Sequence, residues 1–133
     1  GSVTAIYSVL VEGDDPNEPV SDAIRGILDG HIMLDRRIAE TGRYPAINIL
    51  ESISRLAARA HDSSQAARAA KARTVVSLFE DSEEMRRIGG YTPGIDTATD
   101  RARQICPRIY DLIGRKGGGP KDDAFQQLRE IIG

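Results

Sequence analysis

The protein contains no tryptophan, a single cysteine (Cys106) and few aromatic residues, which make up 5% of its 133 positions. We therefore expect an aliphatic core and no internal disulfide, which fits a reducing, cytoplasmic setting. A basic excess is also lacking, because 18 Lys and Arg stand against 20 Asp and Glu and give a formal net charge of −2. This balance argues against a dedicated nucleic-acid-binding protein. The longest apolar runs, such as Tyr7 to Val11, are far shorter than the ~20 residues of a membrane-spanning helix, and we expect no signal peptide.

Motifs of common nucleotide, redox and metal sites are missing as well. The sequence contains no G-x-x-x-x-G-K-[ST] loop, no G-x-G-x-x-G, no C-x-x-C and no H-E-x-x-H. Gly117–Gly119 lacks a preceding buried strand and is followed by Pro120, so we interpret it as a flexible linker rather than a phosphate-binding loop. His31 and His61 stand thirty residues apart without an acidic or cysteine cluster, so no metal site is predicted. The residue types alone therefore indicate no active site.

The first 60 residues alternate between extended and helical patterns. Val3–Val11 is rich in β-branched residues with little polar alternation, which predicts a strand buried on both faces, as in a parallel sheet. After it we expect a helix over Pro19–Leu28, a short strand over His31–Leu34, a helical turn over Arg36–Glu40 and extended chain over Tyr44–Ile47. This succession predicts an α/β layer with too few strands for a complete open sheet, so we expect the tail of a larger protein.

After position 60 the pattern becomes helical. A cap within residues 62–64 predicts a helix to about Ile88, and a last helix is expected from residue 122 or 123 onward. Between them, apolar residues at three- and four-residue steps predict a further helix: Ala98, Ala102, Ile105, Ile109 and Leu112. The sequence therefore predicts an α/β part over residues 1–60 and an all-α bundle over residues 61–133.

Two stretches carry a specific resemblance: G-S-V-T-A-I-Y-S-V-L-V-E-G-D-D-P-N-E-P-V and I-L-D-G-H-I-M-L-D-R-R-I-A-E-T-G-R-Y-P-A-I-N-I-L-E-S-I-S-R. They closely resemble the carboxyl-terminal part of the type III protein-export ATPases, above all the flagellum-specific ones, which are cousins of the rotary ATP synthase catalytic β subunit. The similarity is close from position 1 to about 57 and looser to the end. It implies the last strands and helices of a RecA-like parallel-sheet nucleotide-binding domain over residues 1–60, and a carboxyl-terminal helical domain over residues 61–133.

The resemblance also implies a function for the protein of which this chain would be a part. Such an enzyme hydrolyses ATP with Mg²⁺ as a homohexamer at the cytoplasmic face of the inner-membrane export apparatus, and supports flagellar protein export. Its expected partners are a central stalk protein, a regulator, export chaperone–substrate complexes and the export gate. The phosphate-binding loop and the main Mg²⁺ ligands would lie upstream, so this chain alone should be inactive. Two alternatives stay open: a virulence-type injectisome ATPase, and a non-catalytic docking module for chaperone–substrate complexes.

Two residues take a role from the resemblance. Arg55, in E-S-I-S-R, matches the family's arginine finger, a guanidinium that reaches a neighbouring subunit's site and stabilises the negative charge on the γ-phosphoryl oxygens. Tyr44, in R-Y-P-A-I-N, matches the tyrosine whose ring lies against adenine, a contact that a flat aromatic face makes without strict base reading. The second wall of that pocket falls near Leu112 to Gly118, where this chain has no aromatic residue.

Three positions depart from the usual sequence of the family. Asp35 stands where serine is common, and Arg43 and Asn48 stand for the histidine and the aspartate of H-Y-P-A-I-D. Two loops, Gly13–Glu18 and Gly90–Asp96, resemble the loops that face the central shaft of the rotary enzyme. The acidic run at residues 80–84 is interpreted instead as a solvated face of the long helix.

Overall fold

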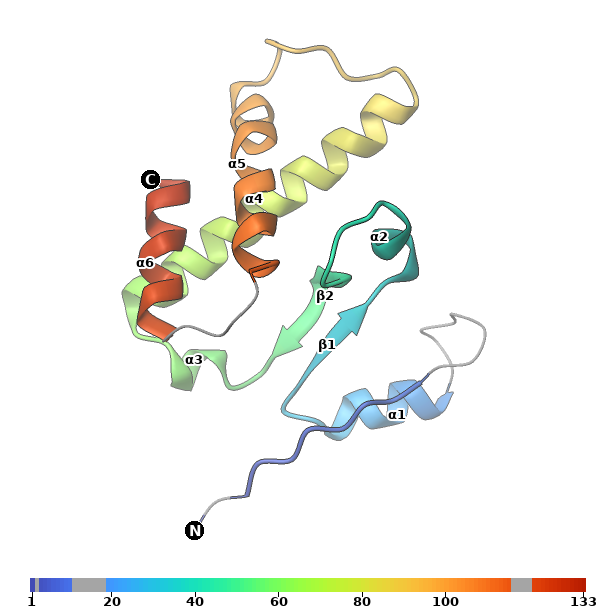
Figure 1. The fold of residues 1–133 in the computed structure, drawn as a ribbon, viewed down its shortest axis with the longest axis vertical. Coiled ribbons are helices and arrows are strands. Elements are labelled where there is room, and N and C mark those ends of the chain that lie inside the picture. Colours follow the sequence, from blue (N-terminus) through green and yellow to red (C-terminus); the bar gives the residue numbers. More distant parts are fainter. Residues whose placement is uncertain (2, 11–18, 116–120) are drawn as a thin grey trace.

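The computed structural model describes residues 1, 3–10, 19–115 and 121–133, which form a small α/β part followed by helices (Figure 1). The α/β part contains α1 (Pro19–Ile27), β1 (Gly30–Leu34), α2 (Arg36–Glu40) and β2 (Ile47–Ser54). The helical part contains α3 (Ala57–Ala60), α4 (Ser63–Arg87), α5 (Thr97–Ile113) and α6 (Lys121–Ile132). The predicted fold class, α/β followed by all-α, is confirmed.

The two strands of the described chain pair with each other as an antiparallel sheet. Gly30 lies opposite Ser54 and Leu34 opposite Ile47, but the register is interrupted between His31 and Met33. The interruption leaves residues 49–52 of β2 without register partners on β1, as a bulge does. Side chains supply part of the bonding there: the Ser52 hydroxyl donates to the carbonyl of Asn48 (2.6 Å) and accepts from the Met33 backbone N–H (3.0 Å).

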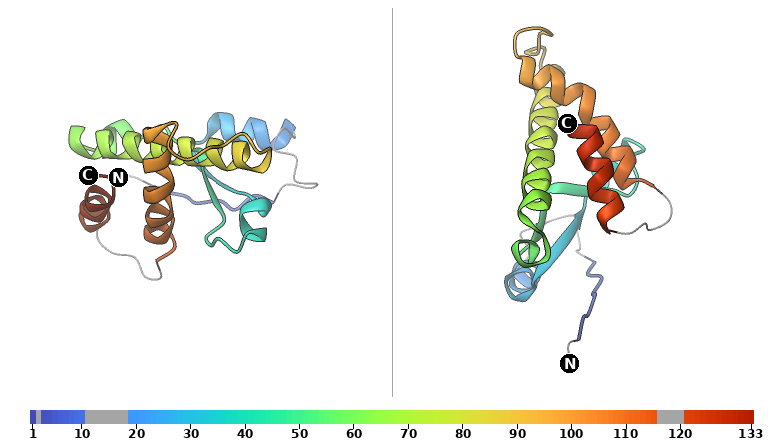
Figure 2. Two further views of the ribbon diagram at one scale, coloured as in Figure 1. Left: turned by 90° about the horizontal axis from the view of Figure 1, so that it is seen from above. Right: turned by 90° about the vertical axis from the view of Figure 1, so that its left-hand side faces the viewer.

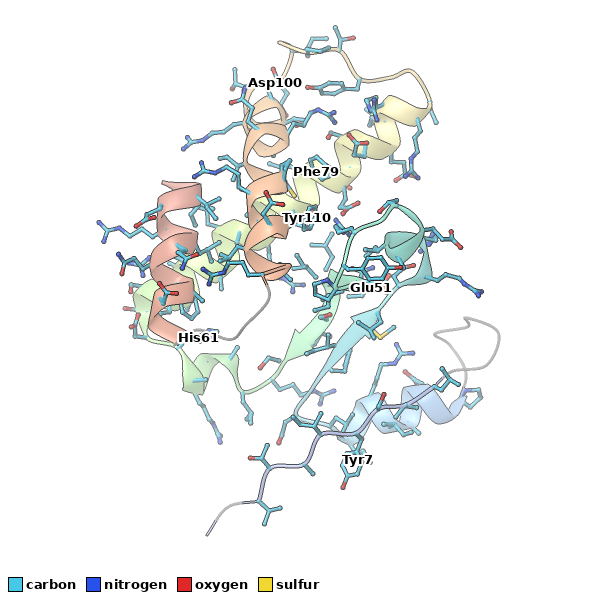
Figure 3. The ribbon with its side chains drawn as sticks, viewed as in Figure 1. Tyr7, Glu51, His61, Phe79, Asp100 and Tyr110 are labelled. Atoms are coloured by element: carbon cyan, nitrogen blue, oxygen red, sulfur yellow. The ribbon has the colours of Figure 1, made fainter. Side chains whose placement is uncertain are left out.

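The strand predicted over Val3–Val11 is wrong for the described residues 3–10. They form extended chain outside any sheet, and the amino terminus lies at the end of the molecule opposite the helical bundle (Figure 1). Val3, Ile6 and Leu10 are each 95% exposed, and Tyr7 also lies in solvent (Figure 3). A strand forms only where its backbone N–H and C=O groups find partners, and the strands β1 and β2 of the described chain pair with one another.

The helical bundle is organised around α4. Asp62 caps this helix by accepting from the backbone N–H groups of Ser64 and Gln65, and the Gln65 side chain closes the capping box. α5 and α6 pack on α4 and on each other, and both lie on one side of it (Figure 2). Residues from all three helices form the buried core: Val76, Cys106, Ile109 and Ile132. The long helix and the aliphatic core predicted from the sequence are confirmed.

Residues 80–84 of α4 do not form the solvated face that the sequence suggested. Ser82 is 3% exposed, and Glu80 and Glu83 are partly buried, whereas Asp81 and Glu84 face solvent. Glu80 and Glu83 are one helical turn apart and therefore share a face, which packs towards α5. Ion pairs with Arg43 and Arg103 accompany their burial.

Candidate functional site

Strand β2 separates the two residues to which the resemblance assigned a role. Tyr44 lies three residues before the strand begins, and Arg55 follows directly after it ends. The register sets the two ends of β2 opposite the two ends of the five-residue β1, which are about 13 Å apart at about 3.3 Å per residue. The structure therefore does not bring Arg55 and Tyr44 together, and they lie beyond opposite ends of β2.

Tyr44 lies in the loop between α2 and β2 and exposes 68% of its surface. The bond between Tyr44 and Pro45 is cis. The loop touches the end of α5, because the Tyr44 carbonyl lies 3.0 Å from the place that a Cβ on Gly114 would occupy. A side chain at position 114 would require the Tyr44 loop to move by a few tenths of an ångström, so glycine favours this close approach. The contact brings part of the expected second wall, near Leu112 to Gly118, next to Tyr44.

Arg55 lies in the turn after β2 with an exposed side chain. Its backbone N–H donates to the Asp29 carbonyl (2.8 Å), which fixes the turn beside the start of β1. Within the described residues, its guanidinium donates one hydrogen bond, from Nη2 to the Arg25 carbonyl (3.4 Å), and forms no ion pair. An exposed guanidinium without a carboxylate partner can accept an anion that approaches from outside the chain.

Arg73 of α4 holds the irregular part of β2, and sequence reasoning missed it. Its Nη1 donates to the carbonyls of Ile49 (2.8 Å) and Ser52 (3.2 Å), and its Nη2 donates to that of Leu50 (2.9 Å). Arg73 thus supplies hydrogen-bond donors to carbonyl groups in the part of β2 that has no register partners on β1. No local signal in the sequence marks it, because a single arginine on a helix is usually a solvated residue.

Two of the departures from the family sequence, Asp35 and Asn48, contact each other. The Asn48 side chain donates to the Asp35 carboxylate, and its Oδ1 accepts from the backbone N–H groups of Leu50 and Glu51 (3.1 Å each). Asp35 also caps α2 by accepting from the Arg37 N–H (2.8 Å). Burial by itself raises the pKa of Asp35, but the hydrogen bonds from Arg37 and Asn48 outweigh it and hold that pKa below its usual value.

The loop over Gly90–Asp96 is tied to the start of α5. The Tyr91 hydroxyl donates to the Asp100 carboxylate, and the Gly94 backbone N–H donates to the same group (2.8 Å). Arg103 lies 4.7 Å from the centre of the Tyr91 ring, and its Nη1 lies 2.7 Å from Oε1 of Glu83. Burial alone raises the pKa of Glu83, but the hydrogen bonds from Arg103 and Arg86 hold it below its usual value. These contacts with α4 and α5, the two helices that the loop joins, hold the loop in place.

Some features are absent from the part of the chain that the structure describes. Within it, no group of three His, Cys, Asp or Glu side chains could hold a metal ion. None of the helices found there is long and apolar enough to cross a membrane. The other loop assigned to the shaft, Gly13–Glu18, lies outside the described residues.

Comparisons with known proteins match both parts of the chain. Residues 1–54 match the ATP synthase alpha/beta family, nucleotide-binding domain, and residues 61–130 match the T3SS EscN ATPase C-terminal domain. The flagellum-specific ATP synthase of Rhizobium meliloti (strain 1021) is 49% identical over 133 residues, which cover 99% of this chain and 28% of that relative.

Solved structures give the same result. The assembled ATPase EscN from the type III secretion system of enteropathogenic E. coli superposes with a TM-score of 0.91 at 36% identity, over 100% of this chain and 33% of that chain. EscN in complex with its central stalk EscO superposes with a TM-score of 0.77 at 31% identity, over 87% of this chain and 29% of that chain.

The chain spans 28% of the length of the curated relative from R. meliloti. The match to the EscN-type carboxyl-terminal domain, over residues 61–130, covers more than half of its 133 residues. With the fold shared over its full length, the chain belongs to the family of type III secretion ATPases.

Proposed function

We propose that this chain is the carboxyl-terminal part of an ATPase that supports flagellar type III protein export. Residues 1–60 would complete a nucleotide-binding domain, and residues 61–133 would form its helical domain. The observation that carries the proposal is the placement of Arg55 and Tyr44 at opposite ends of β2. The similarity to a flagellum-specific ATP synthase over 99% of the chain favours the flagellar system.

Arg55 would act on the nucleotide of a neighbouring subunit. Its exposed guanidinium has no carboxylate partner within the described residues and lies at the end of β2 opposite Tyr44. In a hexamer, such a residue reaches across the subunit interface and stabilises the negative charge that develops on the γ-phosphoryl oxygens. Hydrolysis would then depend on assembly of the ring.

Tyr44 would stack on the adenine of ATP bound by its own subunit. The ring is exposed on a loop whose backbone is fixed against α5 at Gly114, so it can offer a flat face without rearrangement. In line with the resemblance to the export ATPases, we place the Mg²⁺ ligands and the phosphate-binding loop in the part of the enzyme that precedes this chain. The chain alone should not hydrolyse ATP.

The helical domain would carry the contacts with other proteins of the export apparatus at the cytoplasmic face of the inner membrane. Near the end of the Gly90–Asp96 loop, Ile95 is 80% exposed. We assign this loop to the central stalk protein, in line with the EscN–EscO complex. A regulator, chaperone–substrate complexes and the export gate are the further proposed partners.

The test of the catalytic role is Arg55→Ala in the complete ATPase. The kcat should fall about 10³-fold while nucleotide affinity changes little, because the finger acts chiefly on the transition state. Arg59→Ala is the matched control, since Arg59 is also an exposed arginine close by on α3. Hexamers that mix Arg55→Ala subunits with subunits inactivated in the upstream phosphate-binding loop should regain part of the activity. Near-normal turnover of Arg55→Ala would refute the assignment.

A virulence-type injectisome ATPase is the second candidate, and the likeness to EscN favours it. Complementation separates the two systems. The complete enzyme should restore motility to a strain that lacks its flagellar ATPase, and secretion in an injectisome mutant would favour the alternative. A third candidate is a docking module without catalysis. Binding of export chaperones by a complete protein that shows no ATP hydrolysis would support it.

A further inference from the structure

Arg43, the residue before Tyr44, attaches the Tyr44 loop to two helices of the bundle. Its guanidinium carbon lies 3.8 Å from the centre of the Tyr110 ring on α5. Its Nη1 lies 3.2 Å from Oε1 of Glu80 on α4. The Tyr110 hydroxyl donates to the same Glu80 oxygen at 2.5 Å. The three side chains therefore close a triangle, which we call the Arg43 latch (Arg43, Glu80 and Tyr110).

The latch rests on a fixed part of the bundle. Tyr110 packs edge-on against Phe79, with 6.0 Å between the ring centres, and both rings lie where α5 crosses α4 (Figure 3). Burial and the hydrogen bond to Glu80 raise the pKa of Tyr110, so its hydroxyl stays a donor at physiological pH. A planar guanidinium that stacks on a ring and pairs with a carboxylate has little freedom to move.

The latch and Tyr44 differ sharply in exposure. The Arg43 side chain is 24% exposed, whereas Tyr44, the next residue, is 68% exposed. The loop thus buries one residue in the bundle and presents the following one to solvent. On the other side of Tyr44 the backbone is confined by Gly114 at the end of α5.

We propose that Arg43 is a positioning residue for nucleotide binding, which holds the Tyr44 ring where adenine stacks and makes that position depend on the packing of α5 against α4. The proposal rests on the adenine role of Tyr44 given above. A loop that occupies its binding position for only a fraction of the time raises the apparent dissociation constant by the inverse of that fraction. If loss of the latch leaves Tyr44 in place about one fifth of the time, KM for ATP rises about fivefold. The kcat should stay within about twofold, because stacking stabilises the ground state and the transition state equally.

The experiment compares Arg43→Ala, Tyr44→Ala and the double variant in the complete ATPase that contains this chain. We expect KM for ATP to rise about fivefold in Arg43→Ala and about tenfold or more in Tyr44→Ala. The double variant should match Tyr44→Ala, because a residue that acts only through Tyr44 has nothing left to position. Arg43→Lys keeps the charge opposite Glu80 without the planar stacking, and it should recover part of the loss.

The matched control is Arg103→Ala. The Arg103 side chain is also 24% exposed and pairs with a glutamate of α4, Glu83, but it contacts the Gly90–Asp96 loop in place of Tyr44. Its loss should weaken the bundle without raising KM. Amide hydrogen exchange at Tyr44 and Ile47 is the second measurement, and it should accelerate in Arg43→Ala and not in Arg103→Ala.

The outcomes separate this inference from the function on which it rests. A Tyr44→Ala enzyme with unchanged KM refutes the adenine role, and the positioning role falls with it. A raised KM in Tyr44→Ala together with unchanged KM and unchanged exchange in Arg43→Ala overturns the positioning role alone. Additive effects in the double variant, or an equal rise of KM in Arg103→Ala, also overturn it, because Arg43 would then act through general stability.

Discussion

Replacement of Asn48 by aspartate tests the contact between the two departures from the family sequence. Asn48 donates to the Asp35 carboxylate, whose side chain is only 17% exposed. Asn48→Asp removes this donor and sets two carboxylates side by side. Loss of a hydrogen bond to a charged group costs about 1.5–3 kcal/mol. The repulsion adds about 1–3 kcal/mol at a separation of about 5 Å, depending on the effective dielectric constant.

One limit keeps the total below the sum of these figures. Raising the pKa of one carboxyl group by one unit costs about 1.4 kcal/mol. A penalty above about 4 kcal/mol would raise that pKa beyond 7, so protonation of the carboxyl at pH 7 limits the penalty to about this value. We therefore expect Asn48→Asp to lower the free energy of unfolding by about 3 kcal/mol at pH 7, and the Tm by about 9 °C. Urea unfolding of this chain, followed by circular dichroism between pH 3 and 8, measures both the loss and its dependence on pH.

The pH dependence has opposite signs in the two proteins. In the native chain the pKa of Asp35 is lowered on folding, so its contribution to stability is present above the ordinary carboxyl pKa and is lost as the pH falls. In Asn48→Asp the paired carboxylates raise a pKa, so stability is recovered as the pH falls towards 4. Asn48→Ala, which adds no charge, should lose stability without this recovery.

A second substitution makes the test specific. Asp35→Ser in the Asn48→Asp background replaces one of the two carboxylates with a hydroxyl group, and serine can still cap α2. The double variant should regain most of the lost stability. The salt bridge from Asp35 to Arg37 that it gives up is worth little, because Arg37 is 85% exposed. Native-like stability of Asn48→Asp at pH 7, or no recovery in the double variant, would refute the reasoning.

Three further predictions follow from the structure. Tyr44→Phe in the complete ATPase should keep KM for ATP within about twofold, because the exposed ring and not its hydroxyl makes the proposed stack; a rise as large as that of Tyr44→Ala would contradict this. Burial raises the pKa of Cys106 to about 11, so the free energy of unfolding should fall as the pH rises from about 9 to 11, and the fall should be smaller in Cys106→Ala. Val3, Ile6 and Leu10 are each 95% exposed, so this chain should self-associate on its own, and light scattering should show less association for Ile6→Lys than for the native chain.

The parts of the fold that depend on neighbouring residues could be predicted from the sequence. Asp62 and Gln65 form the capping box that begins α4, and apolar residues at helical spacing mark the face of α5 that carries Ala102 and Ile109. The strand predicted over Val3–Val11 is wrong for the described residues 3–10, because β-branched residues only favour extended chain, whereas a strand needs a partner.

The candidate site depended on the resemblance and not on residue chemistry. Residue type alone assigns no role to Arg55 or Tyr44, and only the resemblance of the surrounding sequence does so. The residues that hold them could not be predicted at all, because Arg43 and Arg73 bond to positions 37 and 21–24 residues away. Glu80 and Glu83 were misjudged for a related reason, since a run of acidic residues indicates solvent only when no arginine from another element lies opposite.

Helix α4 bonds to the chain before β2 and to the middle of β2. Glu80 pairs with Arg43 before the strand, and Arg73 donates to the carbonyl groups of Ile49, Leu50 and Ser52 within it. Glu80 and Arg73 are seven residues apart, or two turns and about 10.5 Å along one face of a single rod. A tilt of α4 would therefore move Tyr44 and Arg55 together. If Tyr44 and Arg55 contact nucleotides at neighbouring sites of a ring, the same movement would change both sites. The order in which the two sites react would then be set by the subunit that lies between them.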